Sequence, residues 1–200
     1  NVSAVFDTQI TPSGWTFSIW SVIYIWLTAM IIYILASLCR SPAVLPYGFF
    51  ISWCINLCFN IGWLLVWDRV MIAALVFLIL VICTNYSMIC FICHGLHIYG
   101  PWLKKYHNAD LWLLRVLQVQ NGVMIYTTWT TIATLINLTI VLTYDVKMSP
   151  TDAAFILENI VLDKHVRYIL VIYPVVIWAL AGNLDKNYDA ESPTRNGIFI

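Results

Sequence analysis

Residues 14–39 read GWTFSIWSVIYIWLTAMIIYILASLC, an uncharged run of 26 residues that ends at Arg40. A helix needs about 20 mostly apolar residues to cross roughly 30 Å of hydrocarbon. Uninterrupted apolar runs of about this length are typical of transmembrane helices and not of buried helices in soluble domains. The stretch therefore predicts a membrane-spanning helix.

Four further stretches have the composition of a spanning segment, and charged or turn-forming residues separate them. The last is the shortest, because its uncharged part runs only from Tyr168 to Gly182 and contains Pro174. A helix start signal at Pro150 extends it backward with an amphipathic first half. The predicted fold class is all-α, an integral membrane bundle of five transmembrane helices in one domain over residues 1–200. The spans cover residues 14–39, 47–67, 70–93, 122–144 and 165–183.

The composition supports the same class of protein. Hydrophobic residues make up 62% of the chain and charged residues only 10%, against about 25% charged in globular domains. The mean hydropathy of +0.84 agrees, and together these values argue against a soluble domain, a disordered segment and a secreted disulfide scaffold. Ten Lys and Arg balance ten Asp and Glu, so no basic field favours nucleic acid as a partner.

The connections between the predicted spans suggest a topology. Residues 68–69 make a tight hairpin, whereas residues 94–121 form one long polar connection. Six basic residues against four in the loops favour an N-terminus outside or in a lumen and a cytoplasmic C-terminus. The chain begins without Met or a leader, so we expect processed or omitted residues before Asn1. The glycosylation sequons at Asn85 and Asn137 lie inside spans, and we interpret them as chance matches.

Polar and aromatic residues inside three spans fall on single helical faces, because they recur at intervals of three and four. One interpretation is a shared cavity whose flat rings and amides suit a large, planar, mostly apolar ligand. The other is that the amides join helices while the rings pack. The three rows are Trp20, Tyr24, Leu27 and Ile31; Trp53, Asn56, Asn60, Trp63 and Trp67; and Tyr126, Trp129, Ala133 and Asn137.

Several of these residues stand in recognisable motifs. The run TPSGWTFSIWSVIY at residues 11–24 resembles the first-helix signature of the tryptophan-rich sensory protein (TspO, translocator or peripheral-type benzodiazepine receptor) family. Asn60-x-x-Trp63 resembles that family's second-helix motif, and the row from Tyr126 to Asn137 resembles its fourth-helix motif. Trp178-Ala-Leu resembles a fifth-helix motif, whereas Ile125 replaces a proline of the family pattern.

The resemblance implies a five-helix bundle that binds porphyrins, sterols or synthetic ligands in a cavity, commonly as a homodimer. It requires no cofactor, and porphyrin or haem enters as a ligand. A sterol is the weaker expectation, because Arg195 lies too far after Tyr188 for the family's cholesterol motif, and only a reversed version occurs at residues 164–170. The ligand-binding residues that it implies are Trp20, Tyr24, Asn60, Trp63, Tyr126, Trp129 and Asn137.

A second motif, Cys90-Phe91-Ile92-Cys93-His94, matches the c-type haem attachment pattern. Its thiols fall in an apolar span at the end expected to face inward, which argues against haem attachment. His94 and His97 are three residues apart and, with the two thiols, offer the side chains of a zinc site. The interpretation favoured by the sequence is a helix that ends at Cys93 and His94 without a metal.

No nucleophile, base and acid occur in a catalytic arrangement, and no charged residue lies at mid-membrane, so neither an enzyme nor a proton-coupled transporter is expected. Porphyrin breakdown, which has been linked to some family members, would rest on the cavity Trp residues. The predicted function is a membrane receptor or carrier whose partners are lipid and a flat hydrophobic ligand. The alternative is an accessory or structural subunit of a larger membrane assembly without a small ligand of its own.

Overall fold

The computed structural model describes residues 11–37, 45–67, 69–107, 111, 119–144, 147 and 172–188. Throughout these residues the regular structure is helical, as predicted. The chain enters through a short 3-10 helix, η1 (Gly14–Ser18), and continues directly into α2 (Ile19–Ser37). The further helices are α3 (Tyr47–Val66), α4 (Met71–Tyr106), α6 (Val119–Tyr144) and α9 (Ile172–Asn187).

Four of these helical segments are long and apolar enough to cross a membrane. They are Gly14–Ala36, Tyr47–Val66, Met71–Tyr106 and Asn121–Tyr144. The predicted fifth span at 165–183 is described only from residue 172, within α9. The described residues therefore support a multi-pass membrane bundle with four candidate spans, and the fifth span stays a prediction.

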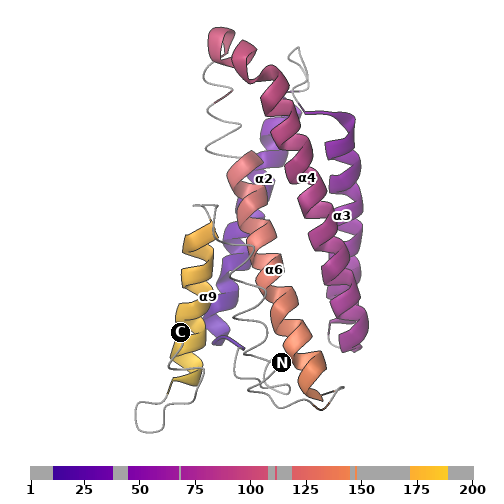
Figure 1. Ribbon diagram of the computed structural model, residues 1–200, viewed down its shortest axis with the longest axis vertical. Coiled ribbons are helices and arrows are strands. Elements are labelled where there is room, and N and C mark those ends of the chain that lie inside the picture. Colours follow the sequence, from indigo (N-terminus) through magenta and orange to yellow (C-terminus); the bar gives the residue numbers. More distant parts are fainter. Residues whose placement is uncertain are drawn as a thin grey trace.

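The prediction that the helix of the third span ends at Cys93 and His94 is wrong. Helix α4 continues without a break to Tyr106 and contains 36 residues, or about 54 Å of helix. It passes through Pro101, and its upper end bends away from the long axis of the bundle (Figure 1), as expected where a proline removes a backbone hydrogen bond. The first 13 residues of the predicted 94–121 connection are thus a rigid helical extension.

Helix α6 lies at the centre of the bundle and packs against α2, α4 and α9, while α3 packs on α4. Figure 1 shows this order across the molecule. Most of the apolar span of α6 is buried inside the bundle, unlike the other three spans. Its many threonines are accommodated because their hydroxyls donate to the carbonyl four residues earlier, as Thr127 does to Val123 and Thr134 to Thr130.

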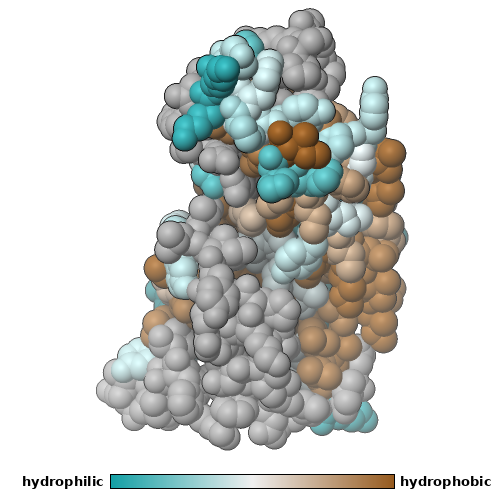
Figure 2. All heavy atoms as spheres, turned by 45° about the horizontal axis from the view of Figure 1, so that its top comes forward, coloured by the Kyte–Doolittle hydropathy of each residue, from teal (hydrophilic) through white to brown (hydrophobic). Residues whose placement is uncertain are grey.

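Two phenylalanine rings join α3 to α4 over glycines. The ring of Phe91 lies over Gly48, and a Cβ atom at Gly62 would come within 2.6 Å of the ring of Phe77. A side chain at either position would have to displace the phenylalanine ring, so the glycines permit this packing of α3 on α4. On the outside, both helices present apolar side chains, and Figure 2 shows a brown apolar flank. Such a surface suits lipid and not water. Examples are Ile51, Ile61, Leu65, Ile72, Val76 and Ile79.

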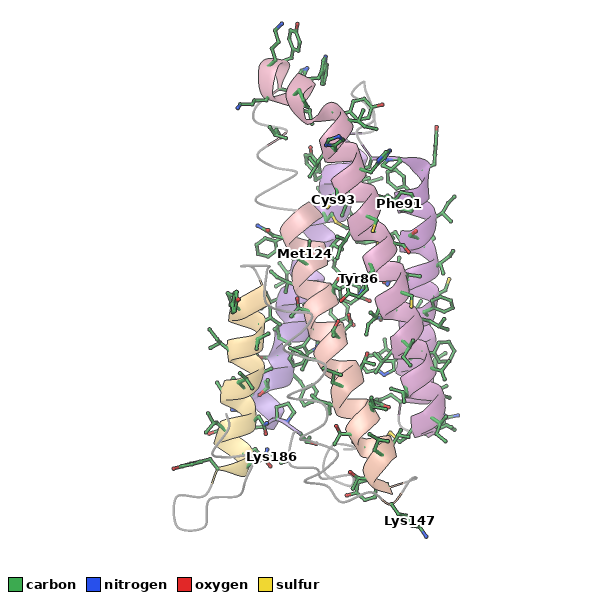
Figure 3. All side chains as sticks on the ribbon, in the orientation of Figure 1. Tyr86, Phe91, Cys93, Met124, Lys147 and Lys186 are labelled. Carbon is green, nitrogen blue, oxygen red and sulfur yellow. The ribbon has the colours of Figure 1, made fainter. Side chains whose placement is uncertain are left out.

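The direction of α9 differs from the predicted topology. The beginning of the first helix meets the end of α9, since the backbone N–H of Ser13 donates to the carbonyl of Gly182 at 2.9 Å. Helix α9 therefore runs parallel to α6, and Lys147 and Lys186 mark the same end of the bundle (Figure 3). The predicted arrangement had the first helix begin on the side opposite to the end of the last helix.

Candidate functional site

Aromatic side chains from α2, α3 and α6 meet around Trp20. The Trp20 ring stacks on Tyr24 at 5.6 Å between centroids and on Trp63 at 5.7 Å, with interplanar angles of 23° and 28°. Tyr126 and Trp129 each stand edge-on to Trp20 at 6.4 Å. We call these five residues the ring cluster. Three near-parallel rings thus form a stack, and two rings from α6 bound it at right angles or nearly so.

The ring cluster runs from the interior of the bundle to its surface. Trp129 is fully buried, Trp63 and Tyr126 are nearly so, Trp20 is half-buried, and Tyr24 is 44% exposed. This gradient follows the packing of α2, which lies against α6 and η1 and makes few backbone contacts with α3. The seam between α2 and α3 is therefore bridged by large rings, and the outer rings face the surroundings of the bundle.

The predicted inward row of α2 is only partly correct. The residues of α2 that face the core are Ile19, Ile23, Leu27 and Met30, whereas Tyr24 and Ile31 point outward. Leu27 is therefore the only member of the predicted row that is fully inside. In α3 the predicted face is correct, since Asn56, Asn60 and Trp63 are all buried. Helix α2 has no charged residue to mark its outer face, and the prediction relied on the aromatic residues, of which Tyr24 points outward.

Beside the rings lies a continuous chain of hydrogen bonds among amide and hydroxyl groups, which we call the amide network. Asn60 Nδ2 donates to the Tyr126 hydroxyl at 2.9 Å, and that hydroxyl donates to Asn56 Oδ1 at 3.1 Å. Asn56 Nδ2 donates to Asn85 Oδ1 at 2.8 Å. Asn85 Nδ2 donates to Thr130 Oγ1 at 3.0 Å, and Thr130 Oγ1 donates to the Tyr126 carbonyl at 2.9 Å. The network joins α3, α4 and α6.

Two members of the amide network were missed at the sequence level. Asn85 was interpreted only as a chance glycosylation sequon, yet it is completely buried and central to the network. Leu78, Val81, Asn85, Met88 and Ile92 form the buried face of α4, and their spacing of three and four could have revealed it. Thr130 lies one residue after Trp129 and had no distinguishing pattern.

Three nominated residues carry buried polar atoms that the rest of the described chain does not satisfy. Nε1 of Trp63 and Nε1 of Trp129 are buried without a hydrogen-bond partner among the described residues, as are both amide atoms of Asn137. Such groups are rare inside proteins, because leaving a buried donor unpaired costs about 1–3 kcal/mol. The two indole N–H groups belong to the ring cluster, so the cluster contains donors that its own neighbours do not use.

Of the seven nominated residues, the structure brings six together. Trp20, Tyr24, Trp63, Tyr126 and Trp129 form the ring cluster, and Asn60 reaches it through the Tyr126 hydroxyl. Asn137 is fully buried on α6, two turns beyond Trp129, and no ring contact or hydrogen bond links it to the cluster. Tyr126 connects the two regions, because its ring belongs to one and its hydroxyl to the other.

The remaining motif residues join the two ends of the described chain. Trp178 Nε1 donates to the carbonyl of Thr16 at 2.9 Å, and Trp15 Nε1 donates to Asp185 Oδ2 at 2.8 Å. The rings of Trp15 and Trp178 meet edge to face at 4.9 Å. Gly182 permits the close approach, since a Cβ atom there would overlap Thr16. We call this contact of η1 with α9 the clasp, and it holds the segment that leads directly into Trp20.

The comparison with protein families agrees with the motifs. Residues 1–194 match the family model described as TSPO-like protein. The chain belongs to the TSPO-like family. No curated protein and no solved structure matches it. The TSPO-like family, the apolar helices and the clustered Trp residues together make the chain a multi-pass membrane protein of the TspO type.

Within the described part of this TSPO-like protein, no three His, Cys, Asp or Glu side chains come together in a way that could hold a metal ion. The chemistry that the ring cluster offers is stacking, edge contacts, two indole N–H donors and the hydroxyls of Tyr24 and Tyr126. The stacking and edge contacts suit recognition of a flat molecule.

Proposed function

We propose that this TSPO-like protein is a membrane receptor or carrier for a flat hydrophobic ligand, porphyrin-like in preference to a sterol, which binds at the ring cluster. The observation that carries the proposal is that the buried indole N–H groups of Trp63 and Trp129, at a stack of near-parallel rings, have no hydrogen-bond partner among the described residues. A porphyrin offers both a planar π surface and polar atoms that accept hydrogen bonds.

The geometry of the rings favours a planar ligand. Aromatic rings prefer offset-stacked or edge-to-face arrangements, and each such pair is worth about 0.5–1.5 kcal/mol beyond the area it buries. The Tyr24–Trp20–Trp63 stack supplies parallel faces, and Tyr126 and Trp129 supply edges. A sterol is thicker and has no π face, so it would use the same rings less well.

The exposure of the outer rings supports an entry route from the bilayer. Tyr24 and Trp20 lie at the seam of α2 and α3, where the rings and not the backbones bridge the helices. A ligand dissolved in the hydrocarbon could reach Trp63 by displacing Trp20, without unfolding either helix. The proposal concerns binding and transfer, and it assigns no catalytic role to the Trp residues.

The test is quenching of Trp fluorescence by protoporphyrin IX in detergent. We expect saturable quenching that Trp129→Phe and Trp63→Phe weaken and that Trp102→Phe leaves unchanged, because Trp102 packs against Tyr106 and His107 near the far end of α4. Quenching that rises linearly and ignores all three substitutions would reflect partition into detergent, and it would contradict the proposal.

A second function has one specific observation in its favour. The amide network satisfies its central amides and hydroxyls internally across α3, α4 and α6, as expected of residues that join helices. If the ring cluster serves the same purpose, the protein is an accessory subunit of a larger membrane assembly or homodimer. In that case Trp63→Ala and Trp129→Ala would release the partner, and porphyrin binding would be absent from the wild type.

A further inference from the structure

The continuation of α4 beyond Cys93 brings thiols and imidazoles onto one side of the helix. Cys90, Cys93, His94 and His97 are spaced 3, 1 and 3 residues apart, and all four are exposed. If the helix ended at Cys93, these side chains would not be held on a common helical face. In an unbroken helix, residues three and four apart are neighbours. The structure thus creates a thiol and imidazole face that the sequence interpretation had set aside.

All five described cysteines lie on the outer surface of the bundle, and none of the five forms a disulfide. Cys54 and Cys58 lie on α3 among apolar neighbours, and Cys83 lies on α4 two turns below Cys90. Only Cys90 and Cys93 have a histidine within one turn.

The position of each donor side chain along α4 determines whether an ion can reach it from the aqueous phase. About 20 helical residues cross the hydrocarbon, so a helix that enters at Met71 leaves it near Phe91. Cys93 and His97 then lie at the level of the headgroups, followed by the exposed Lys104 and Lys105 at the bent end. Figure 3 shows Cys93 above Tyr86 along α4, toward that end.

We propose that Cys93 and His97 form a two-ligand site for a thiophilic d10 cation of the Zn²⁺ type, separate from the ring cluster. Residues four apart on a helix have Cβ atoms about 5–6 Å apart. Bonds of about 2.3 Å to sulfur and about 2.0 Å to nitrogen let one ion bridge such a pair. A site made of a thiolate and an imidazole favours zinc over cations such as Mg²⁺ and Ca²⁺, which prefer carboxylate ligands.

The remaining positions of a tetrahedral ion must be filled from outside the pair, because no three His, Cys, Asp or Glu side chains come together among the described residues. In a monomer, water completes the coordination. In a dimer, the same pair of a second copy completes it, since the face is exposed along α4. The ratio of bound metal to protein distinguishes the two, because a bridged ion is shared by two chains.

The test uses the reduced, metal-free full chain in detergent and Co²⁺ as a spectroscopic probe. We expect a saturable thiolate-to-cobalt charge-transfer band that Zn²⁺ abolishes by displacement. Cys93→Ser should remove the band, and His97→Ala should weaken binding at least about tenfold, as loss of metal-site residues commonly does. Binding should weaken at acid pH, because the thiol must lose its proton.

Cys83→Ser is the matched control, because it removes a thiol from the same exposed face of α4 without a histidine within one turn. A band that survives Cys93→Ser, or that falls equally with Cys83→Ser, would overturn the site, as would loss caused only by Cys90→Ser and His94→Ala. Protoporphyrin quenching should be unchanged in every variant, which shows that the fold is intact and separates this site from the proposed function.

Discussion

The ring cluster and the amide network occupy neighbouring stretches of α3 and α6, yet they differ in how their buried polar atoms are hydrogen-bonded. In the amide network, each group from Asn60 to Thr130 donates to the next. In the ring cluster, two indole N–H groups are buried without a partner among the described residues. Satisfied polar groups hold helices together, whereas unsatisfied buried donors need a ligand or a reason to be tolerated.

The contrast divides the residues that the sequence had grouped together. Asn60 and Trp63 lie on one face of α3 and belong to the same motif. Asn60 donates to the Tyr126 hydroxyl, whereas the Trp63 N–H has no partner in the described part of the chain. The two interpretations of the aromatic and amide rows are therefore assigned to different residues. The amides join helices, and the rings are the candidate binding surface. Four substitutions test this division.

The largest effect is expected for Trp129→Ala. Trp129 is fully buried between α2 and α6, and removing a buried Trp side chain lowers the free energy of unfolding by about 3–5 kcal/mol. Chemical denaturation in detergent measures the loss. Trp129→Phe should retain most of the stability because it keeps a ring in place, so a Phe variant as unstable as the Ala variant would show that the indole N–H has a structural partner.

The next effect concerns the amide network. Asn56→Ala removes the acceptor of the Tyr126 hydroxyl and the donor to Asn85, and we expect it to lower the free energy of unfolding by about 1–3 kcal/mol. Cys54→Ala is the control, since Cys54 is exposed on the same helix, and it should change stability by less than about 0.5 kcal/mol.

Porphyrin affinity of the Asn56→Ala protein should stay close to that of the wild type at temperatures where the protein is folded. Affinity must be measured as well, because a loss of stability alone does not show whether Asn56 belongs to the amide network or to the binding site. Strong loss of affinity in the folded variant would place Asn56 at the binding site and would remove the distinction between network and cluster.

Trp63→Phe is expected to act mainly on binding. Any loss of stability should come from the smaller ring and not from a hydrogen bond, because the Nε1 atom that is lost has no partner among the described residues. Porphyrin should bind about tenfold more weakly, which corresponds to about 1.4 kcal/mol for one lost hydrogen bond. Fluorescence titration measures it, and unchanged affinity would show that the ligand does not use this donor.

The sequence was sufficient for the helical membrane fold and for most of the candidate site, because motif spacing on a helix determines which residues share a face. It failed where the outcome depended on tertiary contacts. Nothing local shows that α4 continues through Pro101, since proline usually ends a helix or bends it, and here the bent helix goes on to Tyr106. The outward position of Tyr24 follows from α2 packing on α6 and not on α3.

The smallest effect is expected at the clasp. Trp15→Phe keeps a ring against Trp178 but removes the N–H that reaches Asp185. Because this hydrogen bond is exposed, we expect a loss of no more than about 0.5–1.5 kcal/mol in the free energy of unfolding. Asp185→Ala should cost a similar amount, and the double variant should cost no more than either single change, because both remove the same bond.

Porphyrin binding is the more informative measurement, since η1 leads directly into Trp20. If the clasp only joins the ends of the bundle, affinity stays at the wild-type value. If affinity falls in both single variants, the clasp positions Trp20, and the clasp must then be counted as part of the binding site.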